Sequence, residues 1–264
     1  MVGTYTNERQ SSMTTPAIFG LDGKTALLIG GATGIGFASA TLLKSAGATV
    51  FLAGRRPDVG AKAAEALGAT YLQVDVTRPE TIQAAVDRVV REQGRLDIAV
   101  NGPGARLNQP AESTTEAQWD DVMNTNLKGV FSACRIEGSA MLEQGSGSIV
   151  NIASLSAYVV NRPQRQAPYN ASKAGLIQYT KSIAAEWATR GVRVNSVSPG
   201  YTETDLTAVS RSKPDIYEVW LAQTPMGRWA KPQEIAGAVL YLACDVSSYT
   251  TGADIIVDGG YSLW

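Results

Sequence analysis

The sequence of 264 residues contains no histidine and only two cysteines. The absence of histidine excludes Ser-His-Asp and Cys-His catalysis and every metal site that needs an imidazole ligand. Cys134 and Cys244 are isolated and lie in segments with a helical pattern. We therefore expect two small buried side chains in a reducing compartment, the cytoplasm, and no disulfide framework.

Long apolar runs and an excess of charge of one sign are also missing. No apolar run approaches the about 20 residues that a membrane span needs, and 23 basic residues balance 24 acidic ones. Neither a membrane nor a nucleic acid is expected as a partner. The first residues, MVGTYTNERQSSMTTP, lack the apolar core of a signal peptide. We expect a polar tail over residues 1–19 and a single domain over residues 20–264.

Short apolar runs typical of buried strands alternate along the chain with amphipathic stretches typical of helices. This order predicts an α/β fold, a single-domain Rossmann-type doubly wound sheet of about seven parallel strands with helices on both faces. Right-handed crossovers would place the carboxyl end of every strand at one edge, where ligands bind. The expected strands are 25–29, 48–53, 70–75, 96–102, 148–153, 192–200 and 253–260, and the expected helices are 36–45, 61–67, 79–93, 116–143 (interrupted near Asn126), 168–190 and 232–243.

A glycine-rich turn, Gly30 to Gly36, joins the first expected strand to the first expected helix. Glycines at this place let a pyrophosphate approach the backbone N–H groups at the start of the helix. Its spacing is GxxxGxG rather than the more familiar GxGxxG. A tight connection without a ligand would also use glycine, but after the first strand of a doubly wound sheet the turn favours a nucleotide.

The end of the second strand indicates which nucleotide. An acidic residue there would bind a ribose 2′-hydroxyl, but the sequence has Arg55 and Arg56, which suit a 2′-phosphate. We expect NADP(H) in preference to NAD(H), although two arginines in a loop could also be merely solvated. Asp75, at the end of the third strand, could accept from an adenine amino group or could serve as a turn or cap residue.

Three residues of one stretch, Ser154, Tyr169 and Lys173, carry the candidate chemistry. Tyr169 and Lys173 are four residues apart, so on a helix that Pro168 can open they share one face. An ammonium close to a phenol lowers the pKa of the phenol, which could then exchange a proton with an alcohol or carbonyl oxygen. Ser154 follows an apolar strand and could bind the same oxygen, although a chance pairing on an amphipathic helix would look alike.

Over residues 20–264 these features together resemble the short-chain dehydrogenase/reductase family. The matching motifs are the GxxxGxG turn, Asn101-Gly102-Pro103-Gly104, Asn126, Ser154, Tyr169 with Lys173, and Pro199-Gly200 with Thr204. The resemblance implies that Tyr169 is the acid/base, that Lys173 holds the nicotinamide ribose and lowers the tyrosine pKa, and that Ser154 polarises the substrate oxygen. It also implies that Asn126 kinks its helix and holds a water linked to Lys173. The cofactor contacts that it implies, beside Tyr169 and Lys173, are Gly30, Thr33, Gly34, Ile35, Gly36, Arg55, Arg56, Asp75, Val76, Asn101, Gly102, Gly104, Pro199, Gly200, Thr202 and Thr204.

Two departures from the family pattern lie close to the expected site. The loop after the fourth strand has NGPG where NNAG is common, and Ser154 lies 15 residues before Tyr169, two more than usual. Ser156 has the usual spacing, but Ser154 is preferred because it stands at the strand end. The extra residues, with TPMGR (224–228) and VDGGYSLW, resemble the polyol dehydrogenase and ketose reductase branch. The expected substrate contacts are Ser154, Ser156, Asn161, Gln164, Tyr169 and Tyr201, with Gln166 also near.

Several alternatives remain open from the sequence. Ser156, Asn161, Gln164 and Gln166 could bind substrate hydroxyls or could form a solvated loop, and 204–222, with Tyr217 and Trp220, would be a mobile lid. The substrate could instead be a 3-oxoacyl thioester or a cyclic ketone, and a non-catalytic NADP(H)-binding sensor is a further alternative. No metal is expected to be needed. The resemblance implies a homotetramer that pairs through helices 116–143 and 168–190 and through the last strand and C-terminal end.

Overall fold

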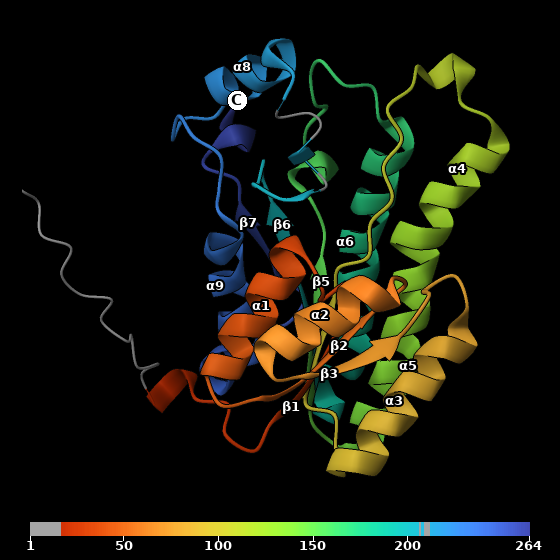
Figure 1. Ribbon diagram of the computed structural model, residues 1–264, viewed down its shortest axis with the longest axis vertical. Coiled ribbons are helices and arrows are strands. Elements are labelled where there is room, and N and C mark those ends of the chain that lie inside the picture. Colours follow the sequence, from red (N-terminus) through yellow and green to blue (C-terminus); the bar gives the residue numbers. More distant parts are fainter. Residues whose placement is uncertain (1–16, 206, 209–211) are drawn as a thin grey trace, which may run out of the picture.

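One parallel sheet forms the centre of the computed structural model, which describes residues 17–205, 207–208 and 212–264 (Figure 1). Within that part of the chain the sheet has seven strands in the order β3-β2-β1-β4-β5-β6-β7. The order reverses between β1 and β4, which confirms the predicted doubly wound sheet. The strands are β1 (Thr25–Ile29), β2 (Thr49–Gly54), β3 (Thr70–Gln73), β4 (Ile98–Asn101), β5 (Gly147–Ile152), β6 (Val192–Pro199) and β7 (Asp254–Val257).

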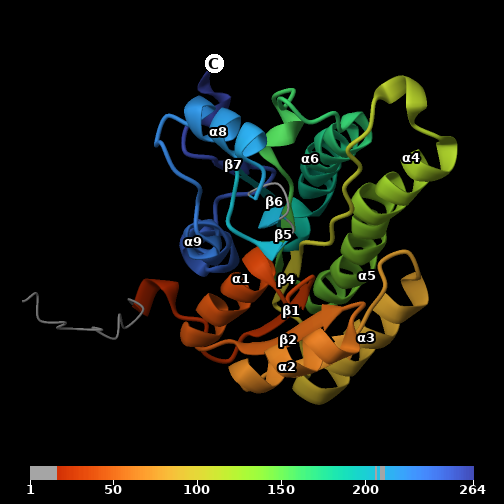
Figure 2. The same cartoon turned by 45° about the horizontal axis from the view of Figure 1, so that its top comes forward.

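Helices cover both faces of the sheet (Figure 2). One face carries α1, α2 and α9, and the other carries α3, α5 and α6. The buried side chains of these two sets of helices form two separate apolar clusters, one on each face. The helices are α1 (Gly34–Ser45), α2 (Pro57–Leu67), α3 (Pro79–Gln93), α4 (Glu116–Met123), α5 (Gly129–Gln144), α6 (Ala167–Trp187), α8 (Pro214–Gln223) and α9 (Pro232–Ala243).

The two clusters follow from the alternation of side chains along the strands. Leu27 and Ile29 of β1 enter the cluster under α3, α5 and α6, whereas Ala26 and Leu28 enter the cluster under α1 and α9. Since both faces of a parallel sheet are covered, its strands read as continuous apolar runs, and all five residues of β1 are buried. The strands therefore end at two edges of the sheet, a carboxyl edge and an amino edge.

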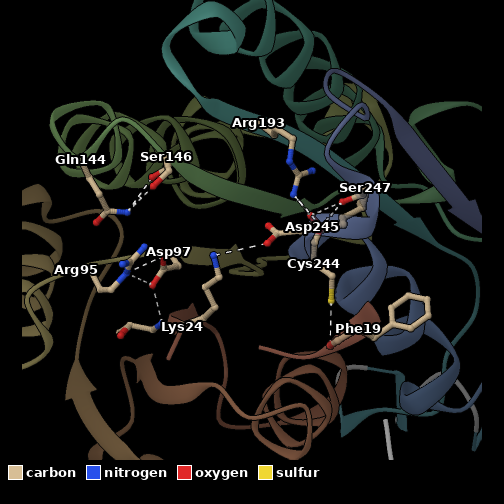
Figure 3. A network of polar contacts seen from close by, with 12 residues as sticks. Phe19, Lys24, Arg95, Asp97, Gln144, Ser146, Arg193, Cys244, Asp245 and Ser247 are labelled. Atoms are coloured by element: carbon tan, nitrogen blue, oxygen red, sulfur yellow. Dashed lines mark hydrogen bonds and ion pairs between the residues drawn. The ribbon is translucent and has the colours of Figure 1, made fainter. Parts of the chain in front are cut away.

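Polar contacts join the chain at the opposite, amino edge (Figure 3). The Asp97 carboxylate accepts from the Thr25 backbone N–H at 2.9 Å and pairs with Arg95, which ties the entry of β4 to the entry of β1. The Arg193 guanidinium donates to the Cys244 carbonyl, and the Cys244 thiol donates to the Phe19 carbonyl. These polar groups at the amino edge therefore bond to one another within the protein.

The expected elements match with small shifts of their ends. Helix α2 begins at Pro57, four residues before the predicted start, because Pro57 suits the first helical turn. Strand β3 ends at Gln73, two residues early, although the Val74 N–H still donates to the Gly54 carbonyl. A π-helical turn, Asn124–Lys128, separates α4 from α5 and confirms the predicted interruption.

The N-terminal prediction concerns residues 1–19, of which 1–16 lie outside the described part. Ala17–Phe19 form a short 3₁₀ helix, and Phe19 packs on the cluster of α1 and α9. Among the described residues, the structure contains no helix long and apolar enough to cross a membrane. The predicted domain boundary at residue 20 stays a prediction.

Candidate active site

Tyr169 and Lys173 lie one helical turn apart near the start of α6, which Pro168 opens in its first turn. Ser154 follows β5 and caps a 3₁₀ turn, Leu155–Ala157, where its Oγ accepts from the Ser156 N–H at 3.1 Å. Ser154 also acts on the Tyr169 phenol, whose pKa it lowers through hydrogen bonding. The strand end and the helix thus bring the three predicted catalytic residues together.

The Tyr169 phenol differs electrostatically from the prediction. Burial raises the pKa of Tyr169, while the hydrogen bond from Ser154 and the charge of Arg106 act in the opposite direction. Lys173 is not among the groups that act on this pKa, so the expected lowering by Lys173 stays a prediction. Lys173 is itself buried, which lowers its pKa to about 8. Its ammonium donates to the Ile152 carbonyl at 2.7 Å and lies 5.8 Å from the centre of the Tyr169 ring.

Asn126 is buried in the π-helical turn and does not line the cavity described below. Its Oδ1 accepts from the Ala105 N–H at 2.7 Å, and its Nδ2 donates to the Ala105 carbonyl and to the Ser172 hydroxyl. Ser172 in turn donates to the Tyr169 carbonyl. Asn126 therefore fastens the loop after β4 to the start of α6. The predicted water between Asn126 and Lys173 stays a prediction.

The glycine-rich turn is shaped as the sequence indicates. Gly30 has a φ of +83°, in the left-handed region, and a Cβ there would stand 2.8 Å from the Gly102 carbonyl oxygen. A Cβ on Gly36 would stand 2.1 Å from the Gly30 carbonyl oxygen. Only glycine lets the turn fold back this closely, which leaves the backbone at the start of α1 open to a ligand.

Basic residues stand at the far end of this turn, where β2 ends. Arg55 and Arg56 both line the cavity, and the charge of Arg55 acts on Asp75. Burial acts to raise the pKa of Asp75, but hydrogen bonds from Thr77 and the Arg55 charge outweigh it, so the pKa is lowered. Asp75 caps the turn through these Thr77 bonds and also faces the cavity, so both predicted uses of this residue remain compatible with the structure.

One cavity of about 710 Å³ connects the glycine turn, the basic end of β2 and the Ser154–Tyr169–Lys173 group. It lies at the carboxyl edge of the sheet, as a doubly wound fold predicts. The predicted site residues that line it are Gly30, Thr33, Gly34, Ile35, Gly36, Arg55, Arg56, Asp75, Val76, Gly102, Gly104, Ser154, Ser156, Asn161, Gln164, Tyr169, Lys173, Pro199, Gly200, Tyr201, Thr202 and Thr204.

Asn101, predicted to contact the cofactor, does not line this cavity. Its side chain is fully buried and its Nδ2 donates to Glu137 at 2.8 Å and to Asn151 at 3.2 Å. Successive residues of a strand face opposite sides of the sheet. Asn101, the last residue of β4, therefore faces Glu137 of α5, whereas the next residue, Gly102, lines the cavity. Asn101 is thus a core residue in this structure.

The polar loop before α6 is buried rather than solvated, so the alternative of a solvated loop is wrong. Asn161, Gln164 and Gln166 are 3%, 8% and 6% exposed. Nδ2 of Asn161 and Nε2 of Gln164 donate to the Tyr201 hydroxyl at 2.9 and 3.0 Å. These two predicted substrate contacts therefore each donate a hydrogen bond to Tyr201, which lines the cavity.

The structure describes only part of the predicted lid, 204–222, because Leu206 and residues 209–211 lie outside the described part. Trp220 of α8 is fully buried and stacks on Tyr201, with ring centres 3.9 Å apart. Its indole N–H donates to the Gln164 side chain and the Arg162 carbonyl. The described end of this segment is therefore anchored against the polar loop, and the mobility of the lid stays a prediction.

Comparison with known proteins identifies the family. A family model described as enoyl-(acyl carrier protein) reductase matches residues 30–262. Galactitol 2-dehydrogenase (L-tagatose-forming) of Cereibacter sphaeroides is 43% identical over 251 residues, covering 94% of this chain and 98% of that protein. The crystal structure of a short-chain type dehydrogenase/reductase from Mycobacterium marinum matches with a TM-score of 0.89 and 38% identity, covering 93% of this chain and 98% of that chain. The chain belongs to the short-chain dehydrogenase/reductase family.

A third relative was solved with a cofactor. The crystal structure of a gluconate 5-dehydrogenase from Burkholderia cenocepacia in complex with NADP and tartrate matches with a TM-score of 0.89 and 31% identity, covering 94% of this chain and 98% of that chain. The family acts on CH–OH groups and binds nicotinamide cofactors, so this chain is an oxidoreductase. The residues present fit such a cofactor, because the glycine turn leaves room beside the start of α1 and guanidinium groups stand at the end of β2.

Sequence reasoning missed two charged residues of this oxidoreductase's cavity, Arg106 and Asp205. Arg106 lines the wall, and its charge acts on Tyr169. It lies in the loop after β4, which has no regular periodicity, so no pattern pointed to it. Asp205 and Thr207 also line the cavity from the partly described lid segment and were likewise not predicted.

Proposed function

We propose that this protein is an NADP(H)-dependent oxidoreductase that interconverts a polyol and a ketose. The observation that carries the proposal is the single cavity in which the glycine turn, the basic end of β2 and the Ser154–Tyr169–Lys173 group meet. The similarity to a galactitol 2-dehydrogenase that forms L-tagatose supports the substrate class.

The residues of the chain would divide the work as follows. A nicotinamide bound in the cavity would supply or accept the hydride. In reduction, Ser154 and Tyr169 bind the carbonyl oxygen, and Tyr169 gives that oxygen its proton. The Lys173 ammonium, held at 2.7 Å from the Ile152 carbonyl, keeps a positive charge below the phenol and would bind the ribose. Asn126 keeps the loop after β4 in place through Ala105.

The preference for NADP(H) rests on the end of β2. Arg55 and Arg56 line the cavity there and β2 itself ends in Gly54, so no carboxylate of this strand end would repel a 2′-phosphate. A guanidinium pairs with phosphate through parallel hydrogen bonds, whereas NAD(H) offers only a ribose hydroxyl. The related gluconate 5-dehydrogenase solved with NADP supports the same preference.

Initial rates with a panel of substrates test the proposal. The panel contains ketoses and polyols, a 3-oxoacyl thioester and cyclic ketones, each assayed with NADPH or NADP⁺ and with NADH or NAD⁺. We expect the highest kcat/KM for a ketose or polyol with the phosphorylated cofactor. Higher kcat/KM for a thioester or cyclic ketone would replace the substrate class, and no turnover with any member would favour the non-catalytic sensor.

We also propose the homotetramer that the resemblance implied. Large apolar side chains are exposed on the expected interfaces, with Trp119 on α4, Phe131 on α5, and Leu263 and Trp264 at the C-terminal end. Covering such side chains by copies of the chain would remove apolar surface from water. The cytoplasmic location stays a prediction.

A further inference from the structure

The polar loop before α6 forms a hydrogen-bond network whose direction starts from Trp220. An indole N–H can only donate, and that of Trp220 donates to Gln164 Oε1 at 2.8 Å. The Gln164 amide nitrogen is thereby directed at the Tyr201 hydroxyl, to which it donates at 3.0 Å. Because Trp220 fixes which end of the Gln164 amide is the oxygen, Tyr201 must accept from Gln164.

Asn161 also donates to Tyr201. Its amide nitrogen lies 2.9 Å from the Tyr201 hydroxyl oxygen, beside the Gln164 amide nitrogen at 3.0 Å. This orients the Asn161 carbonyl oxygen toward Gln166.

The network ends at Ser156 through Gln166. The two protons of Gln166 Nε2 are shared among three acceptors, Asn161 Oδ1 at 2.9 Å and Ser156 Oγ and Asn170 Oδ1 at 3.1 Å each. Since Ser156 Oγ accepts from Gln166, its own proton is available as a donor. Within the described part of the chain the Ser156 hydroxyl donates to no protein group, and Ser156 lines the cavity.

We propose that Ser156 is a specificity-determining residue that donates a hydrogen bond to a substrate oxygen on the carbon next to the reacting one, and that Gln166 is the positioning residue that makes it a donor. Ser154 and Ser156 sit on one 3₁₀ turn, with the Ser156 N–H bonded to Ser154 Oγ at 3.1 Å. Both serines line the cavity from this turn, so their hydroxyls can bind two adjacent oxygens of one substrate. This geometry selects an α-hydroxy ketone or a vicinal diol over an isolated ketone, and the inference rests on the proposed function.

The test is the ratio of kcat/KM for 1-hydroxybutan-2-one to that for butan-2-one, both with NADPH. One neutral hydrogen bond changes such a ratio by about 3- to 10-fold. We expect Ser156→Ala to lower the ratio by about five-fold, because only the hydroxylated ketone offers the second oxygen. Gln166 keeps Asn161 and Asn170 as acceptors in this variant, so no buried donor is left unpaired.

Gln166→Glu tests the positioning role. A carboxylate at residue 166 can only accept, so the Ser156 proton would turn to it and away from the substrate. We expect the ratio to fall about as far as in Ser156→Ala, and the double variant to fall no further than either single one. Asn170→Ala is the matched control, since it removes another acceptor of the same amide without touching Ser156. Its ratio should stay within about two-fold of that of the unchanged protein.

The outcomes separate the claims. An unchanged ratio in folded Ser156→Ala overturns the role of Ser156, and a lowered ratio there with an unchanged ratio in Gln166→Glu overturns only the role of Gln166. If Gln166→Glu does not fold, as judged by thermal unfolding, Gln166→Met replaces it and should lower the ratio by freeing the hydroxyl to rotate. If the unchanged protein oxidises NADPH with neither ketone nor any sugar, the proposed function fails and this inference with it.

Discussion

At the scale of single residues, the site depends on a phenol and an ammonium that are both buried. Burial alone raises the pKa of Tyr169 and lowers that of Lys173, so each group by itself favours its neutral form. Ser154 and Arg106 counteract this at the phenol. A bound substrate oxygen that accepts from Tyr169 therefore meets a phenol that still holds its proton, which is the form needed to reduce a carbonyl.

Tyr169→Phe removes that proton and leaves the ring. We expect kcat to fall at least about 10³-fold, since general acid catalysis and binding of the oxygen are lost together. The dissociation constant of NADPH, measured by fluorescence titration, should change less than about three-fold. Turnover near that of the unchanged protein would show that another group is the proton donor.

Arg55→Ala tests the phosphate site. Loss of a charge-assisted contact to a 2′-phosphate should weaken NADPH binding about ten-fold or more, whereas NADH lacks that group and should be affected less than about two-fold. Arg88→Ala on α3 serves as the control, because Arg88 pairs with Glu92 on the helix surface. Equal losses for both cofactors in Arg55→Ala would contradict the predicted preference.

At the scale of elements, α8 is joined to the polar loop before α6 by one indole. The Trp220 ring stacks on Tyr201 at an interplanar angle of 9°, and its N–H reaches Gln164 and the Arg162 carbonyl. Trp229 packs beside both rings, yet within the described residues its buried N–H has no hydrogen-bond partner. The two tryptophans are similarly buried, but of the two only Trp220 donates hydrogen bonds that join α8 to the polar loop before α6.

Trp220→Phe should therefore separate packing from hydrogen bonding. The ring stays, but Gln164 loses the donor that fixes its amide, so the KM for the ketose should rise about five- to ten-fold while NADPH affinity changes less than about two-fold. Trp229→Phe removes no hydrogen bond and should leave KM nearly unchanged. Steady-state kinetics of the two variants make the comparison, and equal effects would show that only ring packing matters.

At the scale of the whole molecule, the apolar cluster under α5 encloses a carboxyl group. Glu137 is fully buried, and burial raises its pKa to about 7. Its Oε2 accepts from Asn101, while Glu137 Oε1 and Asn101 Oδ1 have no hydrogen-bond partner in the described part of the chain. The charge of Glu137 acts on Cys134 and Tyr179. Burial raises the pKa of both groups, so both stay neutral below pH 8.

Glu137→Gln should change how stability depends on pH. The ordinary pKa of this group is 4.5 and the folded value is about 7, so the folded state binds more protons between those values and its stability falls as pH rises through that window. Glutamine does not titrate and can donate to Asn101 Oδ1. The stability gain of the variant should thus grow from pH 5 to pH 8, by at most about 3 kcal/mol.

Denaturant unfolding at both pH values measures this gain. Glu143→Gln on the exposed side of the same helix is the control and should show no such growth. A gain that is the same at pH 5 and pH 8 would mean that Glu137 does not keep its proton in the folded protein.

The sequence by itself determined the alternation of strands and helices, the glycine turn and the group Ser154, Tyr169 and Lys173. These follow from local rules, because periodicity, glycine and a four-residue spacing each act over one turn or one strand. It also showed two arginines, Arg55 and Arg56, directly after the second strand. The glycine turn, these arginines and the group Ser154, Tyr169 and Lys173 all line the cavity at the carboxyl edge of the sheet.

Only the tertiary structure decided how side chains far apart in the chain face one another. Asn101 turns into the core rather than the cavity because the pleat of β4 places it there, opposite Glu137. The Tyr169 pKa is raised because the folded chain removes water from the phenol, an effect that no spacing reveals. The orientation of the Gln164 amide depends on Trp220, 56 residues away, because the two side chains meet only when α8 packs on the loop before α6.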